Sequence, residues 1–90
     1  MDIGTIKIGM WAVDDVGDYC KVLKVGADLE RSADEDDAVW GEWSNDTSEI
    51  LFTYADSIVS LHRTKKQAKA IADIIKASQW IEEDDYDLSV

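Results

Sequence analysis

The stretch TKKQAKAIADIIKAS, residues 64–78, decides the fold class because it predicts an amphipathic helix. Thr64 begins a capping box, in which its hydroxyl accepts an early backbone N–H and Gln67 reaches back. At about 100° per residue, one face carries Ala68, Ile71, Ile74, Ile75 and Ser78, and the opposite face carries Lys65, Lys69, Asp73 and Lys76. We expect this helix to end near Ser78 and to lay its apolar face across a sheet.

The residues before this helix predict strands. Five stretches are rich in β-forming residues and are separated by Gly, Asp, Asn and Ser: Thr5–Val13, Tyr19–Val25, Val39–Trp43, Glu49–Tyr54 and Ser57–His62. The first two form an antiparallel hairpin around the turn 14–18. We therefore predict an α+β fold, with an antiparallel sheet of about four to five short strands packed by one C-terminal amphipathic helix. Residues 1–81 form the compact domain, and 82–90 form an acidic C-terminal tail.

Length and composition bound the class of protein. Ninety residues suffice for one domain, and 46% are hydrophobic, which excludes a wholly disordered chain. The apolar runs fall well short of the roughly 20 residues that span a bilayer. The start Met1-Asp2-Ile3-Gly4 lacks the basic and apolar regions of a signal peptide, so a cytoplasmic location is expected.

Charge is the strongest signal in the sequence. Nine basic and 20 acidic residues leave a net charge of −11. Residues 63–80 carry five basic residues and one acidic residue, a net +4, so the other 72 residues carry −15. Such a body repels nucleic acid and anionic lipid and attracts basic protein surfaces, although charge of this kind also serves solubility. Lysines at the start of a helix oppose its macrodipole, so they pair either with the chain's own acidic segments or with a partner's acidic surface.

The sequence holds no pattern that predicts a catalytic, metal or cofactor site. The acidic run Asp34–Asp37 is not a calcium-binding EF-hand loop, because its sixth position is Val39 and not glycine. Cys20 is the single cysteine and is expected to be a half-buried hydrophobe; a reactive thiol would need a base. Neither a nucleophile elbow nor a glycine-rich phosphate loop occurs. We expect no enzyme activity, no metal and no cofactor.

Two tryptophans flank Gly41-Glu42 beside the acidic run. Strand alternation places Trp40 and Glu42 on one face and Trp43 on the other, which leaves two readings open: each tryptophan belongs to the core, or one of them is exposed. An exposed tryptophan beside acidic residues suits a protein-binding hot spot. The alternative is that both tryptophans belong to the core.

The leading hypothesis is a small acidic inhibitor or adaptor that binds a basic, nucleic-acid-binding protein and excludes nucleic acid by competition. In size and acidity the chain is similar to small phage-encoded inhibitors, such as DNA mimics and anti-CRISPR proteins. The residues expected to bind the partner are Asp34, Glu35, Asp36, Asp37, Trp40, Glu42, Trp43, Glu82, Glu83, Asp84 and Asp85. One alternative is a structural or assembly protein that self-associates, as a homodimer for example, through the basic helix and the acidic body. Another is a small metal-binding module.

Overall fold

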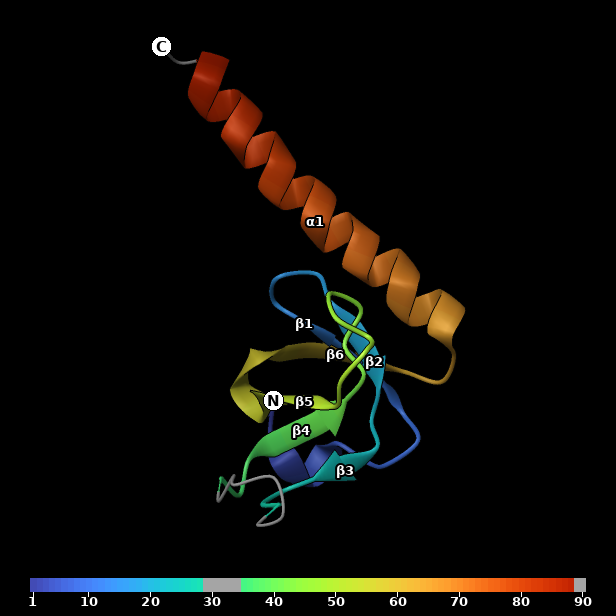
Figure 1. Ribbon diagram of the computed structural model, residues 1–90. Coiled ribbons are helices and arrows are strands. Elements are labelled where there is room, and N and C mark those ends of the chain that lie inside the picture. Colours follow the sequence, from blue (N-terminus) through green and yellow to red (C-terminus); the bar gives the residue numbers. More distant parts are fainter. Residues whose placement is uncertain (29–34, 89–90) are drawn as a thin grey trace.

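Residues 1–28 and 35–88 are described by a computed structural model (Figure 1), with side chains described through Gln79. Over these residues the chain forms six strands, two short 3-10 helices and one long α-helix, which confirms the predicted α+β class. In chain order they are η1 (Ile3–Thr5), β1 (Trp11–Asp14), β2 (Tyr19–Lys21), β3 (Lys24–Val25), β4 (Ala38–Gly41), β5 (Leu51–Tyr54), η3 (Ala55–Ser57), β6 (Ile58–His62) and α1 (Lys65–Leu88).

The strands form two antiparallel sheets of three strands each, and not the single sheet of four to five strands that was predicted. The first sheet has the order β2-β1-β6, with Ala12 paired to both Cys20 and Leu61. The second sheet has the order β3-β4-β5, with Val39 paired to both Val25 and Thr53. The predicted hairpin between the first two strands is confirmed.

The predicted strand Tyr19–Val25 passes from one sheet to the other. The backbone N–H of Val22 donates to the Met10 carbonyl at 2.8 Å, whereas the next N–H, of Leu23, donates to the Trp40 carbonyl at 2.9 Å. The segment therefore changes its hydrogen-bonding partner between two successive residues. A strand that switches sheets in this way makes a corner, and the two sheets close around a shared core.

That shared core draws side chains from both sheets. Its buried members are Ile6, Ala12, Cys20, Val22, Val39, Trp43, Ala55 and Ile58. At Gly41 the two sheets approach closely, because a Cβ at this position would lie 2.5 Å from Cys20 Sγ. Glycine removes that steric conflict, so the sequence Trp40-Gly41 permits the contact between β4 and β2.

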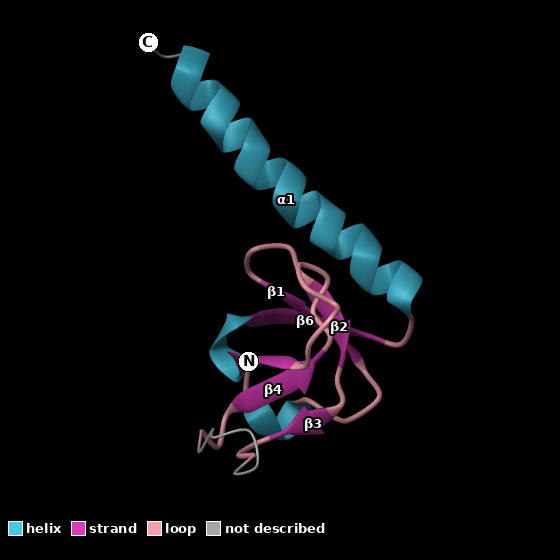
Figure 2. Ribbon diagram, in the orientation of Figure 1, coloured by secondary structure: helices cyan, strands magenta, loops and turns pink. Residues whose placement is uncertain are grey.

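Helix α1 covers the other face of the first sheet (Figure 2). Alternation along β1 turns Ala12 toward the shared core and Val13 toward the helix, where Val13 packs with Ala68 and Ala72. Ile71 and Ile75 lie at the margin of this cluster, as predicted. Ile74 was placed on the apolar face by the sequence, but its side chain is 61% exposed. Ser78 is exposed as well.

The helix is longer than the sequence predicted. It continues to Leu88 and does not end near Ser78. Its second half extends beyond the sheets, with no strand beside it in Figure 1. The segment 82–88, expected as part of an acidic tail, therefore has helical backbone. In the part of the chain that the structure describes, no helix is long and apolar enough to cross a membrane.

The first predicted strand is also shorter than expected. Its beginning forms the 3-10 helix η1, which Asp2 caps by accepting the Gly4 N–H at 3.2 Å, and regular pairing starts only at Trp11. Gly9, with φ of +94°, lies in the turn between these elements. A left-handed residue interrupts a strand, which explains why the alternating pattern over 5–10 did not produce one.

Candidate interaction surface

The loop between β4 and β5, residues 42–50, carries three exposed carboxylates and is called the acidic loop below. These carboxylates belong to Glu42, Asp46 and Glu49. The loop is anchored at its base by Trp43, which is only 4% exposed and packs in the shared core. The Asp46 N–H donates to the Trp43 carbonyl at 2.9 Å, which closes a turn directly above this anchor.

Ser44 fastens the acidic loop to the first sheet. Its N–H donates to the Tyr19 carbonyl at 2.9 Å, and its Oγ accepts the Tyr19 N–H at 3.1 Å. The Ser44 hydroxyl also donates to Oδ1 of Asp18 at 3.4 Å. Three contacts from one residue hold the loop in a defined position against β2.

Asp46 is held in its ionised form. The Ser48 hydroxyl donates to its Oδ1 at 2.6 Å and the Ser48 N–H at 3.2 Å. These hydrogen bonds lower the pKa of the Asp46 carboxyl below its ordinary value. The acidic loop therefore presents a fixed negative charge at neutral pH.

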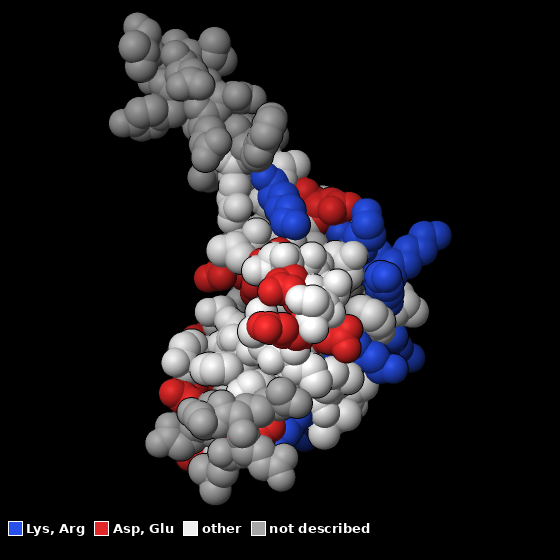
Figure 3. Space-filling view, in the orientation of Figure 1, with Lys and Arg blue, Asp and Glu red and all other residues white. Residues whose placement is uncertain are grey.

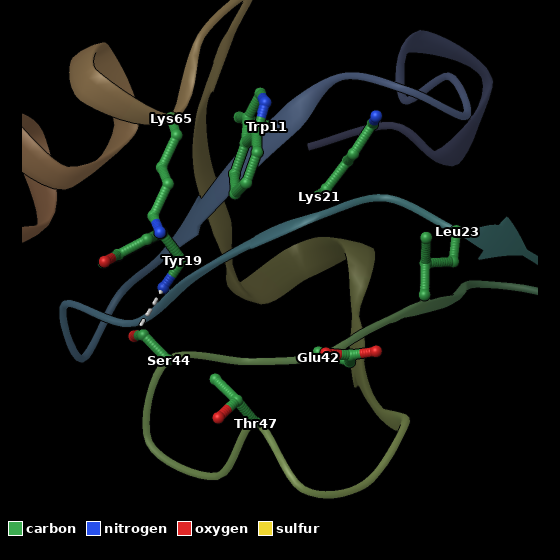
Figure 4. A pocket seen from close by; sticks show the side chains of 8 residues that line it. All are labelled: Trp11, Tyr19, Lys21, Leu23, Glu42, Ser44, Thr47 and Lys65. Carbon is green, nitrogen blue, oxygen red and sulfur yellow. Dashed lines mark hydrogen bonds between the residues drawn. The ribbon is translucent and has the colours of Figure 1, made fainter.

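An open groove of about 360 Å³ lies beside the acidic loop (Figure 4). Trp11 and Tyr19 contribute two aromatic rings, with centroids 6.4 Å apart and planes tilted by 46°. Lys21 and Lys65 line the groove from β2 and from the start of α1, and Glu42 and Ser44 line it from the acidic loop. The groove thus has charges of both signs around an aromatic wall.

Charge is segregated on the face shown in Figure 3. Acidic side chains gather over its middle, and basic side chains gather along the edge beside the start of α1. Two lysines of that helix form ion pairs with carboxylates in different parts of the chain. Lys69 pairs with Asp73 at 3.1 Å, and this contact raises the Lys69 pKa. Lys76 instead pairs with Asp18, a residue outside the helix, at 3.6 Å.

The acidic run before β4 is only partly described. Asp34 lies outside the described residues. Asp36 is exposed, whereas Glu35 and Asp37 are half-buried. Glu35 Oε2 is buried and has no hydrogen-bond partner among the described residues. This run and the acidic loop flank opposite ends of β4, so Asp36 and Glu42 do not form one cluster.

The C-terminal candidates Glu82, Glu83, Asp84 and Asp85 have backbone in α1, and their side chains lie outside the described part of the chain. The helix carries their backbone away from both the run before β4 and the acidic loop (Figure 1). The sequence-predicted carboxylates are therefore divided among three separate segments.

The hypothesis that Trp40 or Trp43 is exposed is wrong. Their exposed fractions are 3% and 4%. Trp40 Nε1 donates to the Gly26 carbonyl at 2.8 Å, and its ring lies 4.8 Å from that of Phe52. Exposed aromatic side chains lie instead on β5: Phe52 and Tyr54 are 36% and 45% exposed and contact each other edge to face. Alternation along β5 was the signal that placed these two on one face.

Cys20 and His62 were considered as reactive side chains, and each lies in the packed structure of the first sheet. Cys20 is buried, more deeply than predicted, and burial raises its pKa to about 12. His62 Nε2 lies 2.9 Å from Ser60 Oγ at the edge of the first sheet. Among the described residues, no three His, Cys, Asp or Glu side chains converge to form a possible metal site.

Sequence reasoning missed Asp46 and Glu49, and it missed the buried carboxylates Asp14 and Asp18. The Asn, Asp and Ser residues between the predicted strands Val39–Trp43 and Glu49–Tyr54 indicated a break, but nothing in them showed that Trp43 would be buried at the base of this loop. Asp14 and Asp18 lie in the predicted turn 14–18, and Oδ1 of Asp14 accepts the N–H groups of Val16 at 3.2 Å and of Asp18 at 2.8 Å. An Asp four residues after another Asp in a Gly-containing turn was the available signal for this arrangement.

Comparisons with protein-family models, with curated proteins and with solved structures found no match to this chain.

Proposed function

We propose that this protein is a small inhibitor or adaptor that binds a basic protein surface through carboxylates fixed on the acidic loop. The partner is a protein whose lysines and arginines otherwise hold nucleic acid. Occupation of those cations by carboxylates would exclude nucleic acid by competition.

The observation that carries this proposal is the fixed position of the acidic loop. Flexible acidic side chains lose conformational freedom when they bind, and a loop that is already anchored avoids part of that loss. Trp43 fixes the base of the loop in the core, and Ser44 ties it to β2. The ionised Asp46 is exposed in this loop, between Glu42 and Glu49 in the sequence.

The charge balance supports the same reading. Residues 1–62 contain 14 acidic and four basic residues, a net charge of −10, so long-range attraction would steer a basic partner toward this part of the chain. The mixed groove beside the loop adds a site for a side chain of the partner. Trp11 and Tyr19 supply aromatic faces there, against which an aromatic or aliphatic side chain of the partner can pack, because Lys21 and Lys65 outnumber Glu42 in the lining and disfavour a further cation.

The test is a capture experiment with a charge-matched control. A Glu42→Lys/Glu49→Lys variant reverses two charges of the acidic loop and leaves Asp46 and its turn intact. An Asp15→Lys/Asp56→Lys variant reverses two exposed charges on the turn after β1 and on η3. Each variant changes the net charge by the same amount.

We expect the unmodified protein to capture a basic nucleic-acid-binding protein from a bacterial lysate, and duplex DNA to displace it. The acidic-loop variant should lose at least tenfold in affinity, and the control should lose far less. Equal losses in the two variants would show that net charge alone attracts the partner. A captured protein that DNA does not displace would contradict the competitive mechanism.

The acidic run before β4 is tested separately. A Glu35→Gln/Asp36→Asn/Asp37→Asn variant removes the three described carboxylates of this run. Full retention of binding would assign the interaction to the acidic loop, and loss of binding would extend the surface along β4.

A further inference from the structure

We propose that α1 is also a self-association element, which pairs in antiparallel orientation with the α1 of a second copy of this chain. This inference does not rest on the proposed function. It follows from an exposed apolar stripe on the helix and from the distribution of charge along it.

The stripe lies on the side of α1 that faces away from the sheets. Ala68 and Ala72 are buried against Val13, whereas Ala70, Ile74 and Ala77 are exposed. At about 100° per residue, these three positions lie on the opposite side of the helix axis from the buried pair. Ile74 is 61% exposed, which leaves a large apolar side chain in water at the centre of the stripe.

The spacing of the stripe is that of a helix-pairing seam. Ala70, Ile74 and Ala77 are separated by four and then three residues, and the sequence continues with Ile81 four residues later. Alternate steps of four and three define the a and d positions of a heptad. Amphipathic packing on the sheet accounts for Ala68 and Ala72 but gives no reason for a second apolar series on the outer side.

Charge along α1 runs in the direction that destabilises a single helix. Lys65, Lys66 and Lys69 lie in its first turns, and the sequence of its last turns contains Glu82, Glu83, Asp84, Asp85 and Asp87. Cations at a helix N-terminus and anions at its C-terminus both oppose the macrodipole. An external group that neutralises both ends would remove this cost.

The chain cannot bring its own acidic end to its own basic end. Glu82 follows Lys65 by 17 residues in one continuous helix, which is about 26 Å at 1.5 Å per residue. Within the described part of the chain, neither Lys65 nor Lys66 has an ion-pair partner. The sequence hypothesis of pairing between the basic helix and the chain's own tail therefore requires a second molecule.

Antiparallel pairing satisfies both features with one arrangement. If Ile74 packs against Ala77 of the second copy, then Ala70 falls opposite Ile81, and each layer joins a large side chain to a small one. In the same register, Lys66 and Lys69 lie opposite the segment 82–85 of the second copy, and the reverse contacts follow from twofold symmetry. Parallel pairing would instead place lysines against lysines and carboxylates against carboxylates.

The first test is the oligomeric state of the whole chain, measured by sedimentation from micromolar to millimolar concentration at low and high salt. We expect a monomer–dimer equilibrium that weakens as salt rises. Ile74→Asp should weaken the dimer at least tenfold. Ile8→Asp is the control, because Ile8 is 66% exposed and lies outside α1. Circular dichroism checks that both variants remain folded. A monomer under every condition, or equal effects of the two variants, would overturn the proposal.

The second test establishes the orientation. Lys66→Glu/Lys69→Glu should weaken the dimer, because it places acidic residues opposite the acidic segment of the second copy. In the register given above, Lys66 lies opposite Asp85 and Lys69 opposite Glu82, so adding Glu82→Lys/Asp85→Lys to the same chain exchanges both charged ends and should restore the dimer. In a parallel pair, each charged end faces the same end of the second copy, so like charges face each other in every variant and neither exchange changes the dimer in this way. Failure of the fourfold variant to restore the dimer would reject the antiparallel arrangement.

Discussion

Lys76 Nζ lies 3.6 Å from Oδ1 of Asp18, the same oxygen to which the Ser44 hydroxyl donates at 3.4 Å. Asp18 precedes β2, Lys76 lies in α1 and Ser44 lies in the acidic loop. One carboxylate therefore connects the helix, the first sheet and the candidate binding loop. Asp18 is only 8% exposed, so these contacts are partly shielded from water.

Gly17 allows α1 to approach the turn that carries Asp18. Its φ is +87°, and a Cβ there would lie 2.6 Å from Lys76 Cγ and 2.9 Å from the Ala72 carbonyl oxygen. We expect Gly17→Ala to destabilise the fold by more than about 1 kcal/mol, because backbone strain and a steric conflict act together. Gly9→Ala is the control, since Gly9 has φ of +94° and nothing within 4 Å of the added Cβ. Urea unfolding of both variants separates the two effects, and equal losses would contradict the close approach.

The Asp14 carboxyl should make stability depend on pH. Its pKa is raised above the ordinary value of 3.8, chiefly by burial, although the Asp18 N–H opposes the shift. The folded state therefore holds this proton to a higher pH than the unfolded state does. The contribution of Asp14 to the free energy of unfolding is largest below pH 3.8 and falls as pH rises through the folded-state pKa.

Asp14→Asn tests this sign. The amide oxygen still accepts the N–H groups of Val16 and Asp18, but it carries no charge. We expect the stability of the variant relative to the unmodified protein to increase as pH rises above 3.8 and to be constant below it. Chemical denaturation at a series of pH values measures this difference. A relative stability that decreases with rising pH would contradict the raised pKa.

The helix start was predictable from the sequence because its signals are local. The spacing of Thr64 and Gln67 was enough to predict the capping box. In the structure the Gln67 N–H donates to Thr64 Oγ1 at 3.2 Å. The burial of Ala68 also followed from helical periodicity alone. The exposure of Ile74 did not, because it depends on how wide a strip of the helix the first sheet covers.

The two-sheet arrangement was not predictable, because it depends on a change of partner and not on strand propensity. Tyr19–Val25 is rich in β-forming residues, and nothing in its pattern shows that the Val22 N–H donates to the Met10 carbonyl while the Leu23 N–H donates to the Trp40 carbonyl. Both Trp40 and Trp43 are buried because the two sheets pack together: Trp43 enters the shared core, while the Trp40 ring lies against Phe52. Alternation assigned these tryptophans to opposite faces but could not show that both faces are covered.

Cys20 should be chemically inert in the folded protein. Burial raises its pKa to about 12, and the Asp14 charge adds to the shift, so the reactive thiolate is scarce near pH 8. We expect a disulfide reagent such as Ellman's reagent to label the thiol rapidly in concentrated guanidinium chloride and only at the rate of opening without it. Rapid labelling under native conditions would show that the contact between the two sheets opens freely.

Loss of the capping hydroxyl should weaken the start of α1. Thr64→Ala removes the acceptor of the Gln67 N–H and is expected to cost about 0.5–2 kcal/mol of stability. Thr64→Ser keeps the hydroxyl and should stay within a few tenths of a kcal/mol of the unmodified protein. Thermal unfolding of the two variants measures the cap directly, and an equal loss in both would assign the effect to the threonine methyl group.

The final prediction concerns the boundary between the compact domain and the end of α1. Gln79 Nε2 donates to the Asp15 carbonyl at 3.1 Å, so helix contacts with the turn after β1 reach at least to this residue. A chain that ends after Gln79 should therefore keep the melting temperature of the full chain within a few degrees, since the buried residues Ala68 and Ala72 remain. It should also lose the salt-dependent dimer, because the acidic segment that pairs with Lys66 and Lys69 is gone. A chain that ends after Ile71 is the control and should unfold, because it lacks Ala72 and the contacts of Ile75 and Lys76 with the first sheet and its turn. If the chain that ends after Gln79 also unfolds, residues 80–88 stabilise the domain itself and do not serve only to bind a partner.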